Sequence, residues 1–196
     1  MNRLNRRGLF AAIFFVAAVP AFAQFSDSFN FLKAVRERDS AKVTAIASNP
    51  ASTAINARES GTGEGALHIL VRGRDLGWLN YLLARGARPD LQDNQGNSPL
   101  LVAAQIGWTE GAEILLDRRA GVNLPNRSGE TPLIIAVQRR DIAMVRLLMG
   151  RGADPSRTDS RAGMSALDYA RRDSRAAPIL RVLETRPAAP AAGPAR

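Results

Sequence analysis

The chain has 196 residues, enough for one ordinary domain, and an apolar share of 45%, which is normal for a folded protein. It contains no cysteine and one histidine, which excludes disulfides, thiolate nucleophiles and metal sites built from sulfur or several imidazoles. The net charge of +9 favours an acidic partner or surface over a basic one, but acidic residues are spread among the basic ones, so the excess does not single out nucleic acid.

The first 23 residues have the three parts of an export signal. A basic start with three arginines precedes an apolar run over 9–19, and Ala21-Phe22-Ala23 forms a small-x-small cleavage pattern. We therefore expect a signal peptide over 1–23 and a mature periplasmic chain that starts at Gln24 and has no stable membrane anchor. The alternatives are an uncleaved anchor, although the run is shorter than the roughly 20 residues that span a bilayer, and a cytosolic N-terminal helix.

Residues 5–10, which include Arg6 and Arg7, resemble a bacterial twin-arginine export signal. Paired arginines also occur in ordinary leaders, so the sequence leaves the export route open. Cleavage after residue 23 would remove three of the nine net positive charges and leave +6.

Helical spacing begins at Ser26, with two apolar stripes separated by a break at Arg38-Asp39 and ended by Asn49-Pro50. The stretch that follows, as far as Gly65, is rich in Ser, Thr and Gly and is typical of an extended loop with a flexible turn at 61–65.

The rest of the chain repeats with a period of 33 residues. Four glycines are separated by 33, 33 and 34 residues, and four leucines keep the same intervals: Gly63, Gly96, Gly129 and Gly163, then Leu67, Leu100, Leu133 and Leu167. The unit over 129–153 predicts a turn, a short helix begun by Thr131-Pro132, a reversal at Arg140-Asp141 and a second helix. One such unit is too small to bury its apolar faces, so stacked copies are expected.

These residues resemble the ankyrin repeat family. The match rests on Asp93-x-x-Gly96 followed by Asn-Ser-Pro-Leu, and on Gly129-Glu-Thr-Pro-Leu followed by Leu147-Leu148 and Gly152-Ala-Asp. It is strongest across 90–155 and extends over about 28–184. The outer units depart from the pattern, and Arg119 stands where a turn glycine is usual.

The resemblance implies an all-α fold, an ankyrin-repeat solenoid of about five helix-turn-helix units joined by hairpin-like turns. The expected domain, 24–184, divides into units at about 28–55, 56–89, 90–122, 123–155 and 156–184. The Pro/Ala-rich segment 185–196 is predicted to be a disordered tail.

His68 is the one histidine and therefore the one imidazole that could act in catalysis. It follows Leu67 at a position where ankyrin repeats often carry a histidine, and the resemblance implies that its ring ties neighbouring loops together. A serine–histidine–aspartate arrangement stays the alternative, although no serine lies in a nucleophile-elbow context. We expect no enzymatic activity, no cofactor and no metal, and a structural role for His68, Thr131, Pro132, Gly96 and Gly129.

The polar positions that stacking leaves free are the candidate binding residues. By resemblance they line the concave face and the turn tips that grip partner proteins in the family. They lie in two neighbouring first-helix rows and at the tips of the turns. The row that begins at Arg36 contains Arg72, Gln105, Gln138 and Arg172, and the row beside it, which begins at Glu37, contains Arg139. The tips carry Arg58, Gln92, Asn94, Gln95, Arg127, Ser128, Arg157 and Arg161. Trp108 could serve contact or packing.

The predicted function is that of an exported, monomeric protein-protein interaction module whose partner is another protein with an acidic patch, and not nucleic acid. By family analogy alone, an alternative is an inhibitor or immunity-type protein that neutralises a periplasmic enzyme or toxin. Two further alternatives are an enzyme that uses His68 and a binder of an acidic polymer or anionic membrane surface.

Overall fold

The structure, a computed structural model, describes residues 21–49 and 52–185. Most of the proposed signal peptide and of the predicted tail therefore lies outside the described residues. Within them the fold is all-α, and strand-like pairing is limited to one isolated bridge between Thr158 and Ser165.

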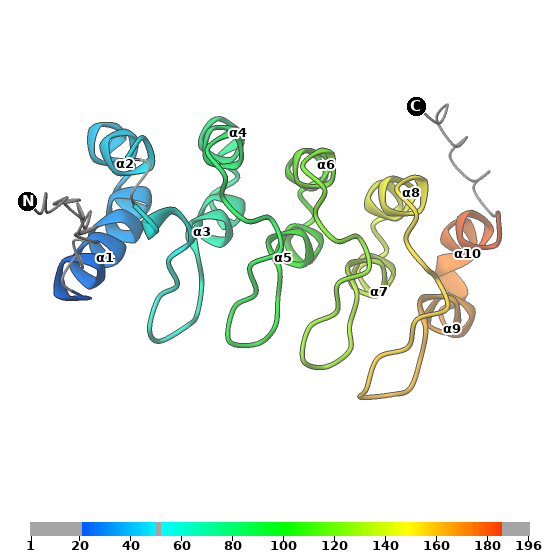
Figure 1. Ribbon diagram of the computed structural model, residues 1–196. Helices are drawn as coiled ribbons and strands as arrows, with labels where there is room; N and C mark the ends of the chain where they lie inside the picture. The colour runs from blue at the N-terminus through cyan, green and yellow to red at the C-terminus, as the bar shows by residue number, and fades with distance from the viewer. Residues whose placement is uncertain (1–20, 50–51, 186–196) are drawn as a thin grey trace, which may run out of the picture.

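Ten α-helices form five antiparallel pairs in the part of the chain that the structure describes (Figure 1). We call the first helix of each pair the inner helix and the second the outer helix. The pairs are α1 (Ala21–Glu37) with α2 (Ser40–Ala47), α3 (Ala66–Arg72) with α4 (Leu76–Ala84), α5 (Pro99–Ile106) with α6 (Thr109–Asp117), α7 (Pro132–Gln138) with α8 (Ile142–Gly150), and α9 (Ala166–Arg172) with α10 (Ala177–Glu184).

The pairs stack side by side into a solenoid, so that inner helices contact inner helices and outer helices contact outer helices. Figure 1 shows three rows: the outer helices along one side, the inner helices in the middle, and the connecting loops projecting beyond the inner helices. One continuous apolar core runs through the stack between the two helix rows, and Leu100, Leu133 and Leu148 are fully buried in it.

Polar caps start the helices where the sequence pattern predicts. The hydroxyls of Ser98 and Thr131 accept the backbone N–H groups of the third residues of α5 and α7, and the prolines that follow them fill first-turn positions that need no donor. The carboxylates of Asp39, Asp75 and Asp141 cap three outer helices in the same way.

The turn inside four of the units requires a left-handed residue, and three arginines supply it. Arg38, Arg74 and Arg140 have φ angles of 56°, 51° and 57°, and Gly107 occupies the equivalent place with 65°. Each arginine reaches the next unit: Arg74 donates to the carbonyl of Ile106 at 2.8 Å, and Arg38 and Arg140 pair with aspartates of the following turns. The backbone cost of a non-glycine residue is therefore accompanied by a contact between units.

Two features differ from the sequence prediction. Helix α1 begins at Ala21 and so includes the proposed cleavage junction at Gln24. The loop before Gly65 is ordered by hydrogen bonds and is not a flexible turn: it contains a 3-10 turn at Ala54–Asn56 and closes on itself when Glu59 N–H donates to the Glu64 carbonyl. Periodicity does not report such local backbone bonds.

Trp108 packs inside the molecule and takes no part in the exposed surface. It precedes α6, is 4% exposed, and its ring lies so close to Gly111 that any Cβ there would fall 2.1 Å from a ring carbon. Gly111 thus leaves the space that the indole fills.

Candidate protein-binding surface

Within residues 52–185, four loops with the same closure project from the row of inner helices. In each, a backbone N–H donates to a carbonyl four or five residues later, which defines four fingers: finger 1 (59–64), finger 2 (93–97), finger 3 (126–130) and finger 4 (159–164). We call the surface made by these fingers, the residues directly before them and the exposed ends of the inner helices the inner face.

Backbone hydrogen bonds tie each finger to the one before it. Asn94 N–H donates to the Thr62 carbonyl at 2.9 Å, Arg127 N–H to Gln95 at 3.0 Å, and Ser160 N–H to Ser128 at 2.8 Å. These bonds join residues about 32 positions apart at the same place in successive units. The finger tips therefore form a fixed row, which is the rigidity that a preorganised binding surface needs.

Glycines permit this close approach. Gly96 and Gly129 have φ angles of +83° and +74°, and a Cβ on either would lie 2.7 or 2.8 Å from the backbone nitrogen of the next finger, at Arg127 or Ser160. Both were expected to be structural, and the geometry gives the reason: a side chain there would separate neighbouring fingers.

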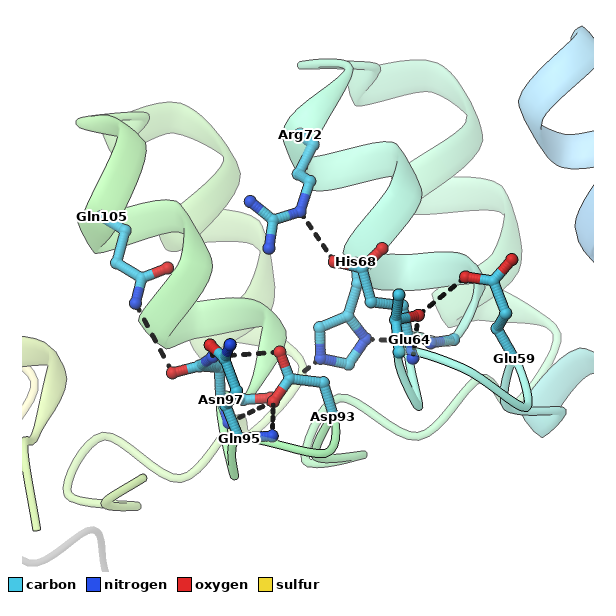
Figure 2. A network of polar contacts seen from close by, with 10 residues as sticks. Glu59, Glu64, His68, Arg72, Asp93, Gln95, Asn97 and Gln105 are labelled. Atoms are coloured by element: carbon cyan, nitrogen blue, oxygen red, sulfur yellow. Dashed lines mark hydrogen bonds and ion pairs between the residues drawn. The ribbon is translucent and has the colours of Figure 1, made fainter. Parts of the chain in front are cut away.

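A buried polar network links α3 to finger 2 (Figure 2). His68 Nδ1 accepts the Gly65 N–H at 3.2 Å, so the neutral ring carries its proton on Nε2 and donates it to the Asn97 carbonyl at 2.9 Å. Asn97 in turn donates from its backbone and side chain to both carboxylate oxygens of Asp93. The His68 side chain is fully buried, and burial lowers its pKa from the usual 6.5.

The side chains of five candidate binding residues make hydrogen bonds within a finger or between neighbouring fingers. Gln92 donates to the carbonyls of Gly96 and Pro125 at 2.6 and 2.9 Å and so bridges fingers 2 and 3. Arg58 and Asn94 join fingers 1 and 2 through a 3.1 Å bond between their side chains. Gln95 and Gln105 both contact Asn97, with Gln105 at 3.5 Å (Figure 2). The polar groups of these five side chains therefore serve mainly contacts within the scaffold.

The ends of the inner helices carry charges that are partly paired. Arg72 donates to Glu64 at 2.8 Å, while Arg36 bonds Glu59 at 2.7 Å. Hydrogen bonds from Arg36 and Thr62 lower the pKa of Glu59 to about 2. Gln138 is exposed and bonds the Tyr169 hydroxyl, whose pKa is raised mainly by its bond to Asp159.

Toward the C-terminal end of the face, two arginines each make one side-chain hydrogen bond, and Arg157 also interacts with the charge of Asp154. Arg157 donates to the Asn123 carbonyl at 3.0 Å, and Arg172 lies 3.0 Å from the Met164 sulfur. Both side chains remain exposed, so most of their donors are open to a partner.

Three candidate arginines have no side-chain partner among the described residues. Arg127 and Arg161 lie at the tips of fingers 3 and 4, and Arg139 ends α7; all three are exposed. Ser128 lies beside Arg127. Its N–H donates to the side-chain oxygen of Asn126, and its carbonyl accepts the Ser160 N–H. The three free guanidinium groups thus all belong to units four and five, the C-terminal half of the inner face.

Sequence reasoning missed one residue of this surface, Phe29. Its side chain is 65% exposed on α1. The available signal was its position outside the buried stripe of Phe31, Leu32, Ala34 and Val35. Residues 21–49 and 52–185 contain no cluster of three His, Asp or Glu side chains that could hold a metal ion, and none of their helices is long and apolar enough to cross a membrane.

Two comparisons of the sequence with known proteins find ankyrin repeats. A family model described as ankyrin repeats (3 copies) matches residues 67–159, from α3 to finger 4. An ankyrin repeat-containing protein of Treponema pallidum (strain Nichols) is 36% identical over 110 residues, which are 56% of this chain. The chain covers only 37% of that relative's length. Repeats of this family generally mediate protein-protein interactions and are typically not enzymes.

Proposed function

This chain is an ankyrin repeat protein, and we propose that it binds one particular protein through the inner face. The observation that carries the proposal is the set of free guanidinium groups on Arg127, Arg139 and Arg161, held on fingers and a helix end that are tied to their neighbours. Exposed charges with no internal partner add nothing to stacking, so we assign these guanidinium groups a role in binding another molecule.

The chemistry of these groups favours a partner with an acidic patch. A guanidinium group has a planar fork of donors that matches a carboxylate in two parallel hydrogen bonds. Arg157 and Arg172 extend the same surface, each with one internal side-chain hydrogen bond. Charges at the rim of such an interface mainly raise the association rate and specificity, so we expect the affinity to fall as salt is added.

A non-enzymatic role is supported by His68. Both of its ring nitrogens are engaged within the protein and its side chain has no exposed surface, so no substrate could reach it without opening the stack. A general base must lie within hydrogen-bond reach of the proton it takes. Loss of a measurable activity in a His68→Ala variant that stays folded would contradict this view.

We further propose that the chain is exported and acts in the periplasm, on the strength of the three-part leader over 1–23. Mass measurement of the protein recovered from the periplasmic fraction tests this: a chain that begins at Gln24 is expected. Recovery of a chain with residues 1–23 intact in the cytosol would contradict export.

Capture from a cell extract tests the binding proposal directly. We expect the wild type, immobilised as bait, to retain a protein that the Arg127→Glu/Arg139→Glu/Arg161→Glu variant does not retain. The matched control reverses three exposed arginines of the outer side, Arg118, Arg146 and Arg181, and should retain it. Both variants should keep the helical circular dichroism of the wild type. Equal capture by the two variants would exclude the inner face as the site, and capture that survives half-molar salt would exclude a mainly electrostatic contact.

A further inference from the structure

A pocket lies at the N-terminal end of the inner face, between α1 and the first half of finger 1. Its volume is about 350 Å³, at the lower end of the range typical of ligand sites. One wall comes from α1, with Phe29 and Leu32, and the other from residues 58–61. Phe29 is 65% exposed, whereas Leu32 is 5% exposed and belongs to the core.

The apolar wall of the pocket is unusual for this protein. Within residues 27–49 and 52–185, the exposed large apolar side chains are Phe29 and Leu76, and Leu76 lies at the start of an outer helix. A phenylalanine that faces a pocket presents apolar area that water solvates poorly, and covering that area is favourable.

Three cationic and two acidic side chains line the pocket, and two of the cations, Arg58 and Arg36, are anchored by hydrogen bonds. Arg58 donates from Nε to the Gly63 carbonyl and from Nη2 to Asn94, which leaves further donors of its guanidinium group open. Arg36 is anchored by Glu59 at 2.7 Å, and Lys33 stands one turn earlier on α1 at 3.9 Å from Glu37. The combination is an apolar floor with charges at its edge.

We propose that this pocket receives one bulky apolar side chain of the acidic protein partner, with carboxylates next to that side chain meeting Arg58 and Lys33. The inference rests on the proposed function, because the pocket is continuous with the inner face through Arg58 and Asn94. Interfaces commonly concentrate their binding energy in such a buried anchor surrounded by polar contacts. The arginines of fingers 3 and 4 then supply charge attraction, and the pocket supplies discrimination between acidic surfaces.

The test uses two short acetylated peptides made of glutamates around one central residue, phenylalanine in the first and serine in the second. Binding to the full mature chain is measured by fluorescence anisotropy at low salt. We expect the phenylalanine peptide to bind about tenfold more tightly, since burying an aromatic side chain is worth a factor of that order or more. Phe29→Ala should reduce the ratio to near one, whereas Leu76→Ala, the matched exposed apolar residue outside the face, should leave it unchanged.

A second variant keeps the test independent of losses at Phe29. No atom lies within 4 Å of a Cβ built at Gly61, so Gly61→Phe would fill the pocket from its opposite wall and should also abolish the preference. Equal binding of both peptides by the wild type would overturn the pocket assignment and leave the acidic-partner proposal standing. No binding of either peptide would contradict both.

Two other occupants give different results, and either would overturn the assignment to a separate partner. If a second copy of the chain fills the pocket, light scattering will show a dimer that Phe29→Ala dissociates. If the chain's own leader fills it, the peptide preference will appear only after residues 1–23 are removed.

Discussion

His68 couples the stability of the stack to pH because burial lowers its pKa below 6.5 in the folded state. At a pH below 6.5 the imidazole therefore binds a proton more readily in the unfolded chain than in the folded one. The free energy of unfolding should fall as pH drops below 6.5, by at most about 1.36 kcal/mol per pH unit. It should be level above that range. No other histidine contributes, since the chain has one.

Urea unfolding at pH 7.5 and 5.5 measures this slope. The His68→Gln variant is expected to be less stable at both values but to lose the decline between them. A wild type and variant with the same decline would show that His68 is not the group responsible.

Arg119 has an unfavourable left-handed backbone conformation, and among the described residues no side-chain hydrogen bond or ion pair offsets its cost. Its φ is +64°, where the equivalent positions are Gly86 and Gly152, and its side chain is exposed. Arg119→Gly should therefore stabilise the protein by about 0.5–1 kcal/mol. The control is Arg118→Gly, which replaces a residue with φ −93° and should destabilise by a similar amount. Thermal or urea unfolding of both variants decides, and a loss of stability in Arg119→Gly would contradict the argument.

At the scale of single residues, the sequence separated buried from exposed positions better than it separated free from engaged ones. Arg72 and Arg139 occupy neighbouring rows of the repeat, yet Arg72 pairs with Glu64 and Arg139 has no partner among the described residues. Gln92 is a binding candidate by position, but its amide bridges two fingers. Such contacts depend on side-chain geometry between units, which periodicity does not contain.

The fingers are the elements that turn a stack of helices into one continuous surface. Gly129→Ala should disturb this arrangement, since φ is +74° and the new Cβ would lie 2.8 Å from the Ser160 backbone nitrogen. We expect a loss of at least about 1 kcal/mol in the free energy of unfolding. Faster hydrogen exchange at the Ser160 amide, which bonds finger 3, should accompany it.

Gly150→Ala is the matched control for that change. Gly150 ends α8, and nothing lies within 4 Å of a Cβ built there, so alanine should raise stability by up to about 1 kcal/mol. A Gly129→Ala protein as stable as the wild type, with an unchanged Ser160 amide, would show that the finger contacts do not require glycine.

Helix positions were predictable because they follow from local chemistry. Thr131-Pro132 marks the start of α7 through a hydroxyl cap and a residue with no N–H to satisfy, and Asp141 marks the start of α8 through a carboxylate cap. The finger-to-finger bonds were not predictable, because they are made by backbone groups of residues such as Arg127 and Gln95 that carry no sequence signature. The same holds for the pocket beside Phe29, which needs the fold to bring residues 58–61 against α1.

At the largest scale, residues 21–49 and 52–185 form a row of five helix pairs whose two long sides differ in character. The outer helices stack through apolar residues such as Leu79, Leu115 and Leu148. The inner face instead presents fixed fingers, free arginines and, at one end, an apolar pocket. A partner that spans the inner face could contact several units at once, as solenoid surfaces allow.

Hydrogen–deuterium exchange of the chain with and without its captured partner shows which side of the stack binds. We expect slower exchange on binding in fingers 2, 3 and 4 and at the ends of α5, α7 and α9, with unchanged exchange in α4, α6 and α8. Protection confined to the outer helices α4, α6 and α8 would contradict this expectation and place the partner on the opposite side of the stack.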